Sequence, residues 1–447
     1  MSLTSPRLIE HLKHRHERQR LFPKALLTGL LCGLLAISFR EFLRLGETLR
    51  AGLLAQLHPW QIQGFLIFFI GIWLLMLISV WLVRWLEPAA SGSGIPHLKA
   101  VLLNLEKFRP LRIMVVKFLS GGIGISAGYA LGREGPTVQM GGAVGALIAS
   151  WTRSPHPERQ TLISAGSAAG LSASFNAPLS GLTFIIEELG LHHPVAFFAT
   201  GIACVISDLI CREVLGQHPL LSVKLPGPPE LETLPFFLVI GLAAGCFGAL
   251  FNRLLMGISG RARAMSNATR VLSIGLLALA TAGLGWYAPN IIGSGSHLLD
   301  AVLGEDLDLG LGIPLLFLAT RLALTLAGYS TSTAGGIFSP VLILGAFLGA
   351  SLVGIGNLLL ETSLPNIHEA AVVGMASLFS AVARTPMTAM VLMVEMTGSY
   401  THILPLFIGV IAASFTADAL GQLPIYEALL ERDQIDRIET VTPRKER

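Results

Sequence analysis

Three short segments of the sequence share one pattern, in which glycine is followed by proline and then by an apolar stretch. They are Gly92-Ser93-Gly94-Ile95-Pro96, Gly132-Arg133-Glu134-Gly135-Pro136 and Gly336-Ile337-Phe338-Ser339-Pro340. Proline suits the first turn of a helix, because its missing N–H has no partner there. That turn leaves up to four backbone N–H groups unpaired and carries the positive end of the helix dipole. Three such helix starts that converge would bind an anion without a full cation and would release it again.

Glu134 lies inside the second of these segments. An ionised carboxylate at membrane depth is unstable unless it finds hydrogen-bond donors. The N–H groups that bind an anion would bind this carboxylate as well, so Glu134 and the anion should compete for one place. Protonation would release the side chain and open the path, so one residue could gate anions and carry protons. The alternative is a structural salt bridge from Glu134 to Arg133 or Lys117.

A second kind of chemistry is indicated by Gly257-Ile258-Ser259-Gly260, which fits the GxSG nucleophile pattern of rhomboid-like intramembrane serine proteases. Such an enzyme needs a histidine base inside the membrane. The candidates near the ends of apolar runs are His297, His368 and His402. Arg261 follows the serine closely and indicates a cytoplasmic loop, so the sequence favours a protein that is not an enzyme. No Walker motif is present, which favours transport driven by ion gradients.

The elements that must position these residues are membrane-spanning helices. Of 447 residues, 52% are apolar and only 13% are charged, which is too little charge for the surface of a soluble protein. Residues 64–83 carry no charge and are long enough to cross a bilayer, and residues 234–251 and 271–288 are further candidates. Many other apolar stretches are short and broken by glycine or proline. Broken helices at membrane depth are tolerated where they line a polar cavity, which favours a transporter or channel.

The chain ends predict its orientation. Residues 1–24 carry six lysines and arginines against Glu10 and Glu17, and lack the cleavable apolar stretch of a secretory signal. The positive-inside rule therefore places this basic segment in the cytoplasm. Residues 427–447 are expected to form a short cytoplasmic tail without regulatory domains. The net charge of +3 then reflects orientation, and no nucleic-acid partner is expected.

An internal repeat divides the chain into two predicted transmembrane halves, residues 25–225 and 234–426, with a boundary near 226–234. At a separation of 204 residues, Gly132, Pro136, Gly141 and Gly145 match Gly336, Pro340, Gly345 and Gly349. At a separation of 208, Gly166, Pro178, Glu187 and Gly190 match Gly374, Pro386, Glu395 and Gly398. Interrupted segments at matching positions of two halves predict a binding site between them.

The three glycine–proline segments, in this order and spacing, resemble the signature segments of the CLC family of chloride channels and transporters. The resemblance runs from about residue 25 to Tyr426. It implies an all-α polytopic membrane protein with two inverted repeats of many short, tilted, broken helices. It also implies a homodimer in which each subunit has its own pathway, in a prokaryotic plasma (inner) membrane with both termini cytoplasmic. The implied function is a secondary antiporter that exchanges chloride for protons and uses no cofactor.

By the same resemblance, chloride is bound by the hydroxyl of Ser93, the backbone N–H groups of Ile337 and Phe338, and the phenol of Tyr426. Ser93 favours chloride over nitrate, since nitrate-selective relatives tend to carry proline there. One departure from the family is His97, which occupies a position where many relatives carry glutamate. We interpret His97 as a polar residue at a helix start.

The resemblance also implies a proton path. Glu134 would be the external gate, and Glu188 would be the internal proton acceptor that pure channels generally lack. No metal site is expected, because no spacing among the four cysteines suits one. The residues expected to support these sites are Gly92, Gly94, Pro96, Lys117, Gly132, Arg133, Gly135, Pro136, Glu187, Gly336 and Pro340.

Glu187 and Glu188 end the apolar run at residues 181–186. Adjacent residues on a helix point about 100° apart, so the two side chains should meet different surroundings. Glu187 has a repeat partner, Glu395, which favours an architectural role for that pair, whereas Glu188 aligns with Met396. The alternative for Glu188 is a carboxylate that faces the cytoplasm, and a passive chloride channel on the same fold is then the closest rival function.

Overall fold

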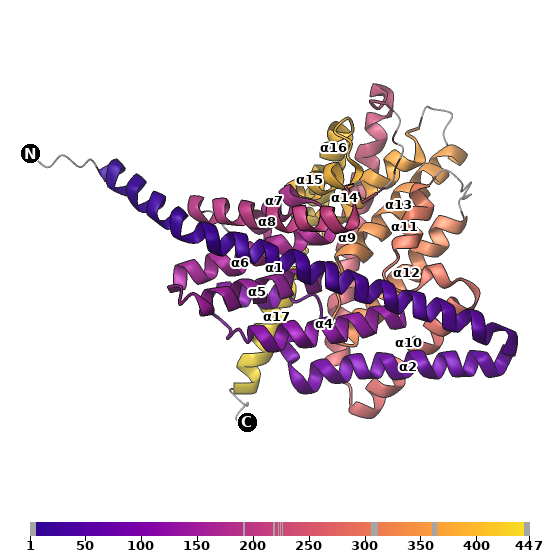
Figure 1. The fold of residues 1–447 in the computed structure, drawn as a ribbon. Helices are drawn as coiled ribbons and strands as arrows, with labels where there is room; N and C mark the ends of the chain where they lie inside the picture. Colours follow the sequence, from indigo (N-terminus) through magenta and orange to yellow (C-terminus); the bar gives the residue numbers. More distant parts are fainter. Residues whose placement is uncertain are drawn as a thin grey trace, which may run out of the picture.

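The computed structural model of the chain is almost entirely helical (Figure 1). It describes residues 6–190, 193–217, 220–221, 223, 225, 227–304, 312–359 and 364–441, and the backbone alone for residues 6–16, 297, 300–301 and 437–441. The described residues contain no β-strand, and their extended pairing is limited to two isolated backbone bridges. Pro226, at the predicted boundary between the halves, lies outside the described residues.

The helices follow one another in the same order in both halves. Those of the first half are α1 (Pro6–Leu57), α2 (Gln61–Leu86), α3 (Ile95–Leu102), α4 (Pro110–Ala127), α5 (Glu134–Trp151), α6 (His156–Phe175), α7 (Pro178–Leu189) and α8 (Pro194–Leu215). Those of the second half are α9 (Leu234–Arg263), α10 (Asn267–Tyr287), α11 (Ser296–Leu303), α12 (Gly312–Ser330), α13 (Phe338–Leu359), α14 (Ile367–Ala383), α15 (Pro386–Thr397) and α16 (Ile403–Ala419). The last helix is α17 (Ile425–Val441).

The repeat predicted from the sequence is present in the helices. Helices α3 and α11 both have 8 residues and both follow a left-handed glycine, Gly94 or Gly295, with φ of 81°. Helices α7 and α15 both have 12 residues and begin with proline. Helix α5 packs against α6, and α13 packs against α14 in the same way. These matched helices agree with the repeat predicted from the sequence.

Glycine at the matched positions lets the paired helices touch. A Cβ atom at Gly141 would lie 2.1 Å from the carbonyl oxygen of Gly166, across the contact of α5 with α6. At the equivalent contact of α13 with α14, a Cβ atom at Gly345 would lie 2.4 Å from the carbonyl oxygen of Gly374. Real Cβ atoms do not approach oxygen this closely, so glycine is required on both sides of each contact. This explains why the same glycines recur in both halves.

We expect Gly166→Ala to destabilise the protein by about 1–3 kcal/mol, because the new methyl group must force α5 and α6 apart. The matched control is Gly71→Ala on α2, where a Cβ atom would meet nothing within 4 Å. Alanine favours helix over glycine, so the control should be neutral or slightly stabilising. Thermal unfolding of both variants in detergent provides the measurement, and equal midpoints would contradict this packing argument.

The predicted basic segment and the first apolar stretch form one continuous helix, α1, which is in front in Figure 1. The helix does not break at residues 24 and 25, although Pro23 lies inside it. Proline removes only one backbone hydrogen bond, and Leu21 is buried in a cluster formed with residues of α6 and α8. Lys24 Nζ lies 2.7 Å from Glu158 Oε2 and 2.7 Å from Ser154 Oγ, so this part of α1 is tied to the start of α6.

The predicted C-terminal tail begins as helix α17, which packs against α3, α9 and α14. Leu429 of this helix is only 3% exposed. Arg263 at the end of α9 pairs with Asp433 at 2.5 Å and also with Asp436. The described part of the tail is therefore a structural element of the body of the protein.

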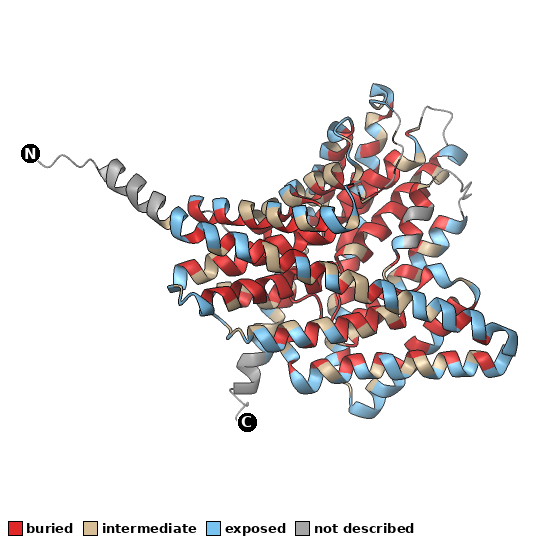
Figure 2. Ribbon diagram, in the orientation of Figure 1, coloured by how far each residue is buried: buried red, intermediate tan, exposed pale blue. Residues whose placement is uncertain are grey.

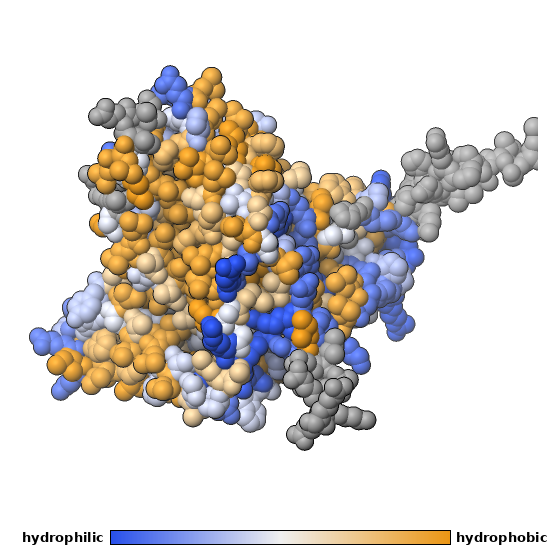
Figure 3. All heavy atoms as spheres, turned by 180° about the vertical axis from the view of Figure 1, so that it is seen from behind, coloured by the Kyte–Doolittle hydropathy of each residue, from blue (hydrophilic) through white to orange (hydrophobic). Residues whose placement is uncertain are grey.

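The outside of the molecule is apolar over a wide area. Seven helical stretches among the described residues are long and apolar enough to cross a membrane. Figure 2 shows buried residues through the interior of the bundle, and Figure 3 shows a broad hydrophobic surface with hydrophilic residues gathered towards one side. Large apolar side chains such as Leu209 and Phe415 are 61% and 73% exposed. Such a surface is stable in lipid, and the prediction of a polytopic membrane protein is confirmed.

Candidate anion site and proton pathway

The three glycine–proline segments are joined through their backbones. Gly132 and Gly336 exchange two hydrogen bonds, with N···O distances of 2.7 and 2.8 Å. The N–H of Gly92 donates to the carbonyl of Thr333 at 2.9 Å, and the carbonyl of Gly92 accepts from Gly335 at 3.0 Å. Segments more than two hundred residues apart in the sequence are therefore held side by side.

Three helices begin at this junction. Helix α3 begins at Ile95, α5 at Glu134 and α13 at Phe338, each with a proline in its first turn. A Cβ atom at Gly135 would lie 2.9 Å from Ser93 Cα and 3.0 Å from Gly336 Cα. This close approach requires glycine and brings the three helix starts together. Their first-turn N–H groups and dipoles favour negative charge at the junction.

Ser93 lies at the start of α3 and is 1% exposed. Its Oγ accepts from the backbone N–H of Ile95 at 3.4 Å, and the phenol of Tyr329 on α12 lies close to it. Tyr426, in the first turn of α17, is also 1% exposed and lies within electrostatic range of Tyr329. The hydroxyl and the two phenols therefore supply neutral O–H donors on one side of the junction.

Ile337 and Phe338 lie on the opposite segment and are both 1% exposed. The ring of Phe338 packs against Phe379, with ring centroids 4.0 Å apart, and against Phe175 at 5.0 Å. These rings exclude water from the start of α13. Backbone N–H groups act more strongly on an anion in such surroundings than they would in water.

The carboxylate of Glu134 lies among backbone donors. Its own N–H and the N–H of Ser339, from the third segment, lie close enough to stabilise its charged form. The nearest cation is Arg133, whose Nε lies 3.8 Å from Oε1, which is too long for a hydrogen bond. The other oxygen, Oε2, is buried and has no hydrogen-bond partner among the described residues. The side chain thus occupies the kind of site that an anion would occupy.

Lys117 makes no ion pair with Glu134 in the described structure. Its ammonium is fully buried and donates to the carbonyl oxygens of Ala90 at 2.9 Å and Gly92 at 2.7 Å. Lys117 therefore holds the turn that precedes α3, and of the two alternative salt bridges only the distant contact with Arg133 is present.

Glu187 and Glu395 cap each other's helices. Glu187 Oε2 accepts from the N–H and the hydroxyl of Thr388, at the start of α15, both at 2.7 Å. Glu395 Oε2 accepts from the N–H of Ser180 at 2.8 Å and its hydroxyl at 2.5 Å, at the start of α7. Each carboxylate thus lies at the positive end of the helix in the opposite half, which stabilises both helix starts.

Glu188 has different surroundings from its neighbour. It is 5% exposed, and its Oε1 lies 2.8 Å from the ammonium of Lys99 on α3. Lys99 also lies 3.6 Å from Glu427, which follows Tyr426 on α17. Glu188 therefore does not simply face solvent. It is connected through Lys99 to α3, the short helix that follows Ser93.

His97 lies on α3 between Ser93 and Lys99. Its Nε2 lies 3.3 Å from Glu106 Oε2, and its Nδ1 lies 3.1 Å from Gln139 Nε2. The position therefore makes a contact that becomes an ion pair when the histidine is protonated. His97 does more than begin a helix, because it links α3 to α5 and to the loop that contains Glu106.

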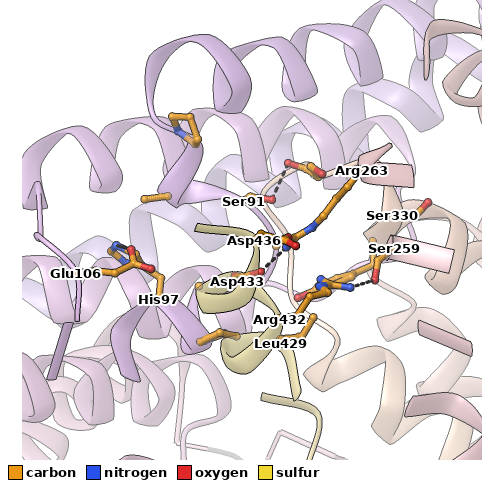
Figure 4. A pocket seen from close by; sticks show the side chains of 17 residues that line it. Ser91, His97, Glu106, Ser259, Arg263, Ser330, Leu429, Arg432, Asp433 and Asp436 are labelled. Atoms are coloured by element: carbon orange, nitrogen blue, oxygen red, sulfur yellow. Dashed lines mark hydrogen bonds and ion pairs between the residues drawn. The ribbon is translucent and has the colours of Figure 1, made fainter. Parts of the chain in front are cut away.

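An inner cavity of about 310 Å³ leads to the junction from the side of α17 (Figure 4). Ser91, Gly92 and Tyr329 line it towards the junction, and Arg432 and Asp433 line it on α17. Burial and repulsion from the neighbouring guanidinium on α9 lower the pKa of Arg432 below its ordinary value. In Figure 4 the charged groups of α17 face this cavity.

An outer cavity of about 340 Å³ reaches the junction from another side. Glu134 and Ser339 line it together with the basic side chains of Arg40, Arg44 and Arg133. Neither Ser93 nor Tyr426 lines this cavity, and Glu134 does not line the inner one. Ser93 and Tyr426 do not line the inner cavity either, so of these three residues only Glu134 borders one of the two cavities.

Ser259 lies in the wall of the inner cavity and has no histidine partner among the described side chains. Its hydroxyl donates to the carbonyl of Leu255 at 2.5 Å and accepts from Arg432 at 2.7 Å. His402 is instead bonded to Glu369 at 2.9 Å, and the side chain of His297 lies outside the described residues. Neither described contact activates the serine as a nucleophile.

Two residues of the site were not found from the sequence, Lys99 and Tyr329. Lys99 is a lysine inside a short helix that begins at a signature segment, and that position was a usable signal. Tyr329 lies near the end of an apolar run that contains no motif. Only its proximity to Ser93 in the structure indicates that it belongs to the site.

Comparison with known proteins agrees with this geometry. Residues 75–418 match the family described as voltage gated chloride channel. The chain belongs to the CLC family. It is 36% identical to the H(+)/Cl(-) exchange transporter ClcA of Klebsiella pneumoniae (strain 342) over 417 residues, which cover 91% of this chain and 88% of that relative. A ClcA transporter of Salmonella arizonae is 35% identical over 440 residues, 95% of this chain and 91% of the relative.

Solved CLC structures have the same fold. The crystal structure of a slow cyanobacterial Cl-/H+ antiporter superposes with a TM-score of 0.88 at 29% identity, covering 93% of this chain and 98% of that one. A CLC-type fluoride/proton antiporter superposes with a TM-score of 0.75 at 22% identity, covering 95% and 99%. The predicted CLC fold is confirmed.

Proposed function

We propose that this CLC chain is a secondary active antiporter in which Glu134 competes with chloride for one anion site and thereby couples chloride to protons. Chloride/proton exchange is the activity named for its ClcA relatives and for the cyanobacterial antiporter. The observation that carries the gating proposal is the position of the Glu134 carboxylate. It lies near backbone N–H groups at the starts of α5 and α13, and among the described residues no cation is within hydrogen-bond distance of it.

Chloride would enter from the inner cavity and meet the hydroxyls of Ser93 and Tyr426. The N–H groups of Ile337 and Phe338 would then bind it at the start of α13. Because Glu134 occupies the next set of donors, chloride passes outward only when that side chain leaves. Protonation removes the charge that holds the carboxylate on those donors, so proton uptake opens the gate.

Protons would reach Glu134 from the inner side by way of Glu188. The chloride ligands are neutral O–H and N–H donors, which suit anions and do not accept protons. A separate acceptor is therefore needed, and Glu188 is buried and paired with Lys99. That pairing favours an exchanger over a passive channel, because a buried proton acceptor is needed only where protons are transported.

The assembly and location are also proposals. We propose a homodimer in the inner membrane of a prokaryote, with one pathway in each subunit and both termini cytoplasmic. The family resemblance and the basic N-terminal segment support this arrangement. The transported ions are chloride and protons, and we propose no cofactor, metal or nucleic-acid partner.

The function is tested by flux from vesicles that contain the purified protein, with chloride and pH recorded together. An outward chloride gradient should drive protons inward against their own gradient. Chloride movement without any proton movement would instead establish the passive channel. Valinomycin and a proton ionophore, added separately, calibrate the two flux signals.

We expect Ser93→Pro to raise nitrate transport relative to chloride. A hydroxyl donor suits a compact halide, and its removal also breaks the contact with Tyr329. Flux from vesicles loaded with either anion gives the ratio of nitrate to chloride transport. Ser91→Pro would be a poor control, because Ser91 lies in the same turn as Ser93. Ser180→Ala, at the start of α7, is the better control and should leave the ratio unchanged. An unaltered ratio in Ser93→Pro would remove Ser93 from the anion site.

We expect Lys99→Met to shift the pH dependence of proton transport towards higher pH. The ammonium at 2.8 Å stabilises the charged form of Glu188, so its loss lets the carboxylate hold its proton at higher pH. Glu427→Gln is the opposing control, because removing a nearby negative charge should shift the profile the other way. Initial proton flux is measured over a series of internal pH values, and shifts of the same sign in both variants would contradict this assignment.

A further inference from the structure

A cavity of about 430 Å³ lies between α2 and α10, apart from the proposed ion pathway. Two arginines, Arg84 at the end of α2 and Arg270 in the first turns of α10, line it. No lining residue is acidic. Figure 1 shows that α2 and α10 are neighbours at the edge of the bundle, so this cavity faces the surrounding membrane.

The two arginines are not neutralised by carboxylates among the described residues. Arg84 Nη1 donates to Asn267 Oδ1 at 3.3 Å, and Arg270 Nη2 donates to the carbonyl of Ala262 at 3.1 Å. These are neutral acceptors, and each guanidinium has five N–H donors. Both therefore keep N–H groups and a full positive charge for an oxyanion, and Arg forms paired hydrogen bonds with phosphate.

The rest of the cavity suits an acyl chain and its glycerol backbone. Trp81 and Trp85 line its outer side and are 52% and 77% exposed, and Val271 of α10 is 42% exposed. Leu77 and Ile274 line it deeper along the two helices. Tryptophan is enriched where the hydrocarbon core meets the headgroups, and arginines just outside it face the headgroup phosphates. Basic pockets between membrane helices on the cytoplasmic side bind anionic lipid headgroups.

We propose that this cavity binds a glycerophospholipid with an anionic headgroup from the inner leaflet. Arg84 and Arg270 bind its phosphate, and one acyl chain lies between α2 and α10 against Val271. A zwitterionic lipid has the same phosphate but adds a cation beside it, so two unneutralised arginines select against it. The site does not depend on chloride/proton exchange, because no residue of the ion pathway lines it.

The test is native mass spectrometry of the full-length protein in detergent, titrated with phosphatidylglycerol or with phosphatidylcholine of the same acyl chains. Wild type should retain phosphatidylglycerol at least about tenfold better, since both arginines attract its anionic headgroup. The Arg84→Gln/Arg270→Gln variant should lose this preference. The matched control is Arg112→Gln/Arg261→Gln, which removes two exposed arginines outside the cavity and should keep it.

A second variant separates the site from general charge effects and from misfolding. Val271→Trp fills the acyl slot and keeps both arginines, so it should also lower phosphatidylglycerol retention. Chloride flux in vesicles reports whether each variant is folded. Equal retention of the two lipids by wild type would overturn the proposal, as would an unchanged preference in Arg84→Gln/Arg270→Gln or full retention in Val271→Trp.

Discussion

Replacing Glu134 with glutamine is expected to leave chloride flux running and to stop coupled proton movement. Glutamine has the shape of the protonated side chain but no proton to exchange, so proton flux should fall at least about tenfold. Chloride flux should also lose most of its pH dependence, because the neutral side chain no longer titrates between the closed and open positions. Simultaneous chloride and pH recordings from vesicles provide both values.

The contacts of Glu134 make this outcome specific. An amide group is held less strongly than a carboxylate by the backbone N–H groups near it, so these donors become available to chloride. Arg133→Gln is a useful companion, because its guanidinium is 3.8 Å from the carboxylate and forms no hydrogen bond with it. That variant should keep coupling. A folded Glu134→Gln protein that passes no chloride would mean that the side chain is structural.

Replacing Glu188 with glutamine is expected to remove uphill proton transport while chloride still crosses. The reason is that the inner acceptor would be lost, whereas Ser93, Tyr426 and the N–H groups of α13 would be unchanged. Proton flux driven by a chloride gradient should fall at least about tenfold, since an amide does not accept a proton at these pH values. The measurement is the same paired recording of chloride and pH.

Its neighbour provides the control on the same helix. Glu187→Gln changes a half-buried cap, in which Oε2 accepts two hydrogen bonds from Thr388. It should preserve coupling and lower thermal stability, because a neutral amide caps α15 less well. Coupling that disappears with Glu187 and survives without Glu188 would reverse the assignment of the two carboxylates.

Much of this fold could be predicted because glycine and proline recur at matching positions in both halves of the sequence. Gly141 and Gly345 recur at matching positions, since each lets two helices touch at a carbonyl oxygen. The prolines after the three glycine segments likewise mark helix starts through local chemistry. Local signals of this kind predicted which residues would begin helices, and the resemblance to a known family predicted that these helices would meet.

The contacts that tune the site were harder to predict, because they join residues far apart in the chain. The pairing of Lys99 with Glu188 spans 89 residues, and neither position alone indicates the other. The predicted division at residue 24 was placed by the basic residues that precede the first apolar stretch, but α1 continues through that point because Leu21 packs against neighbouring helices. For the same reason the charged residues after Tyr426 were predicted to form a tail. Leu429 of α17 is instead buried in the wall of the inner cavity.

The reciprocal caps of Glu187 and Glu395 also constrain the order in which the protein can be built. The N–H groups at the start of α7 have their acceptor in Glu395, which is synthesised 215 residues later. At a synthesis rate of about 5–20 residues per second, roughly 10–40 s pass between the synthesis of these two positions. Throughout this interval, α7 is already made but carries uncapped N–H groups and an unpaired Glu187. The first half is therefore an incomplete product during translation, and its last helices reach their final state only when the ribosome has almost finished.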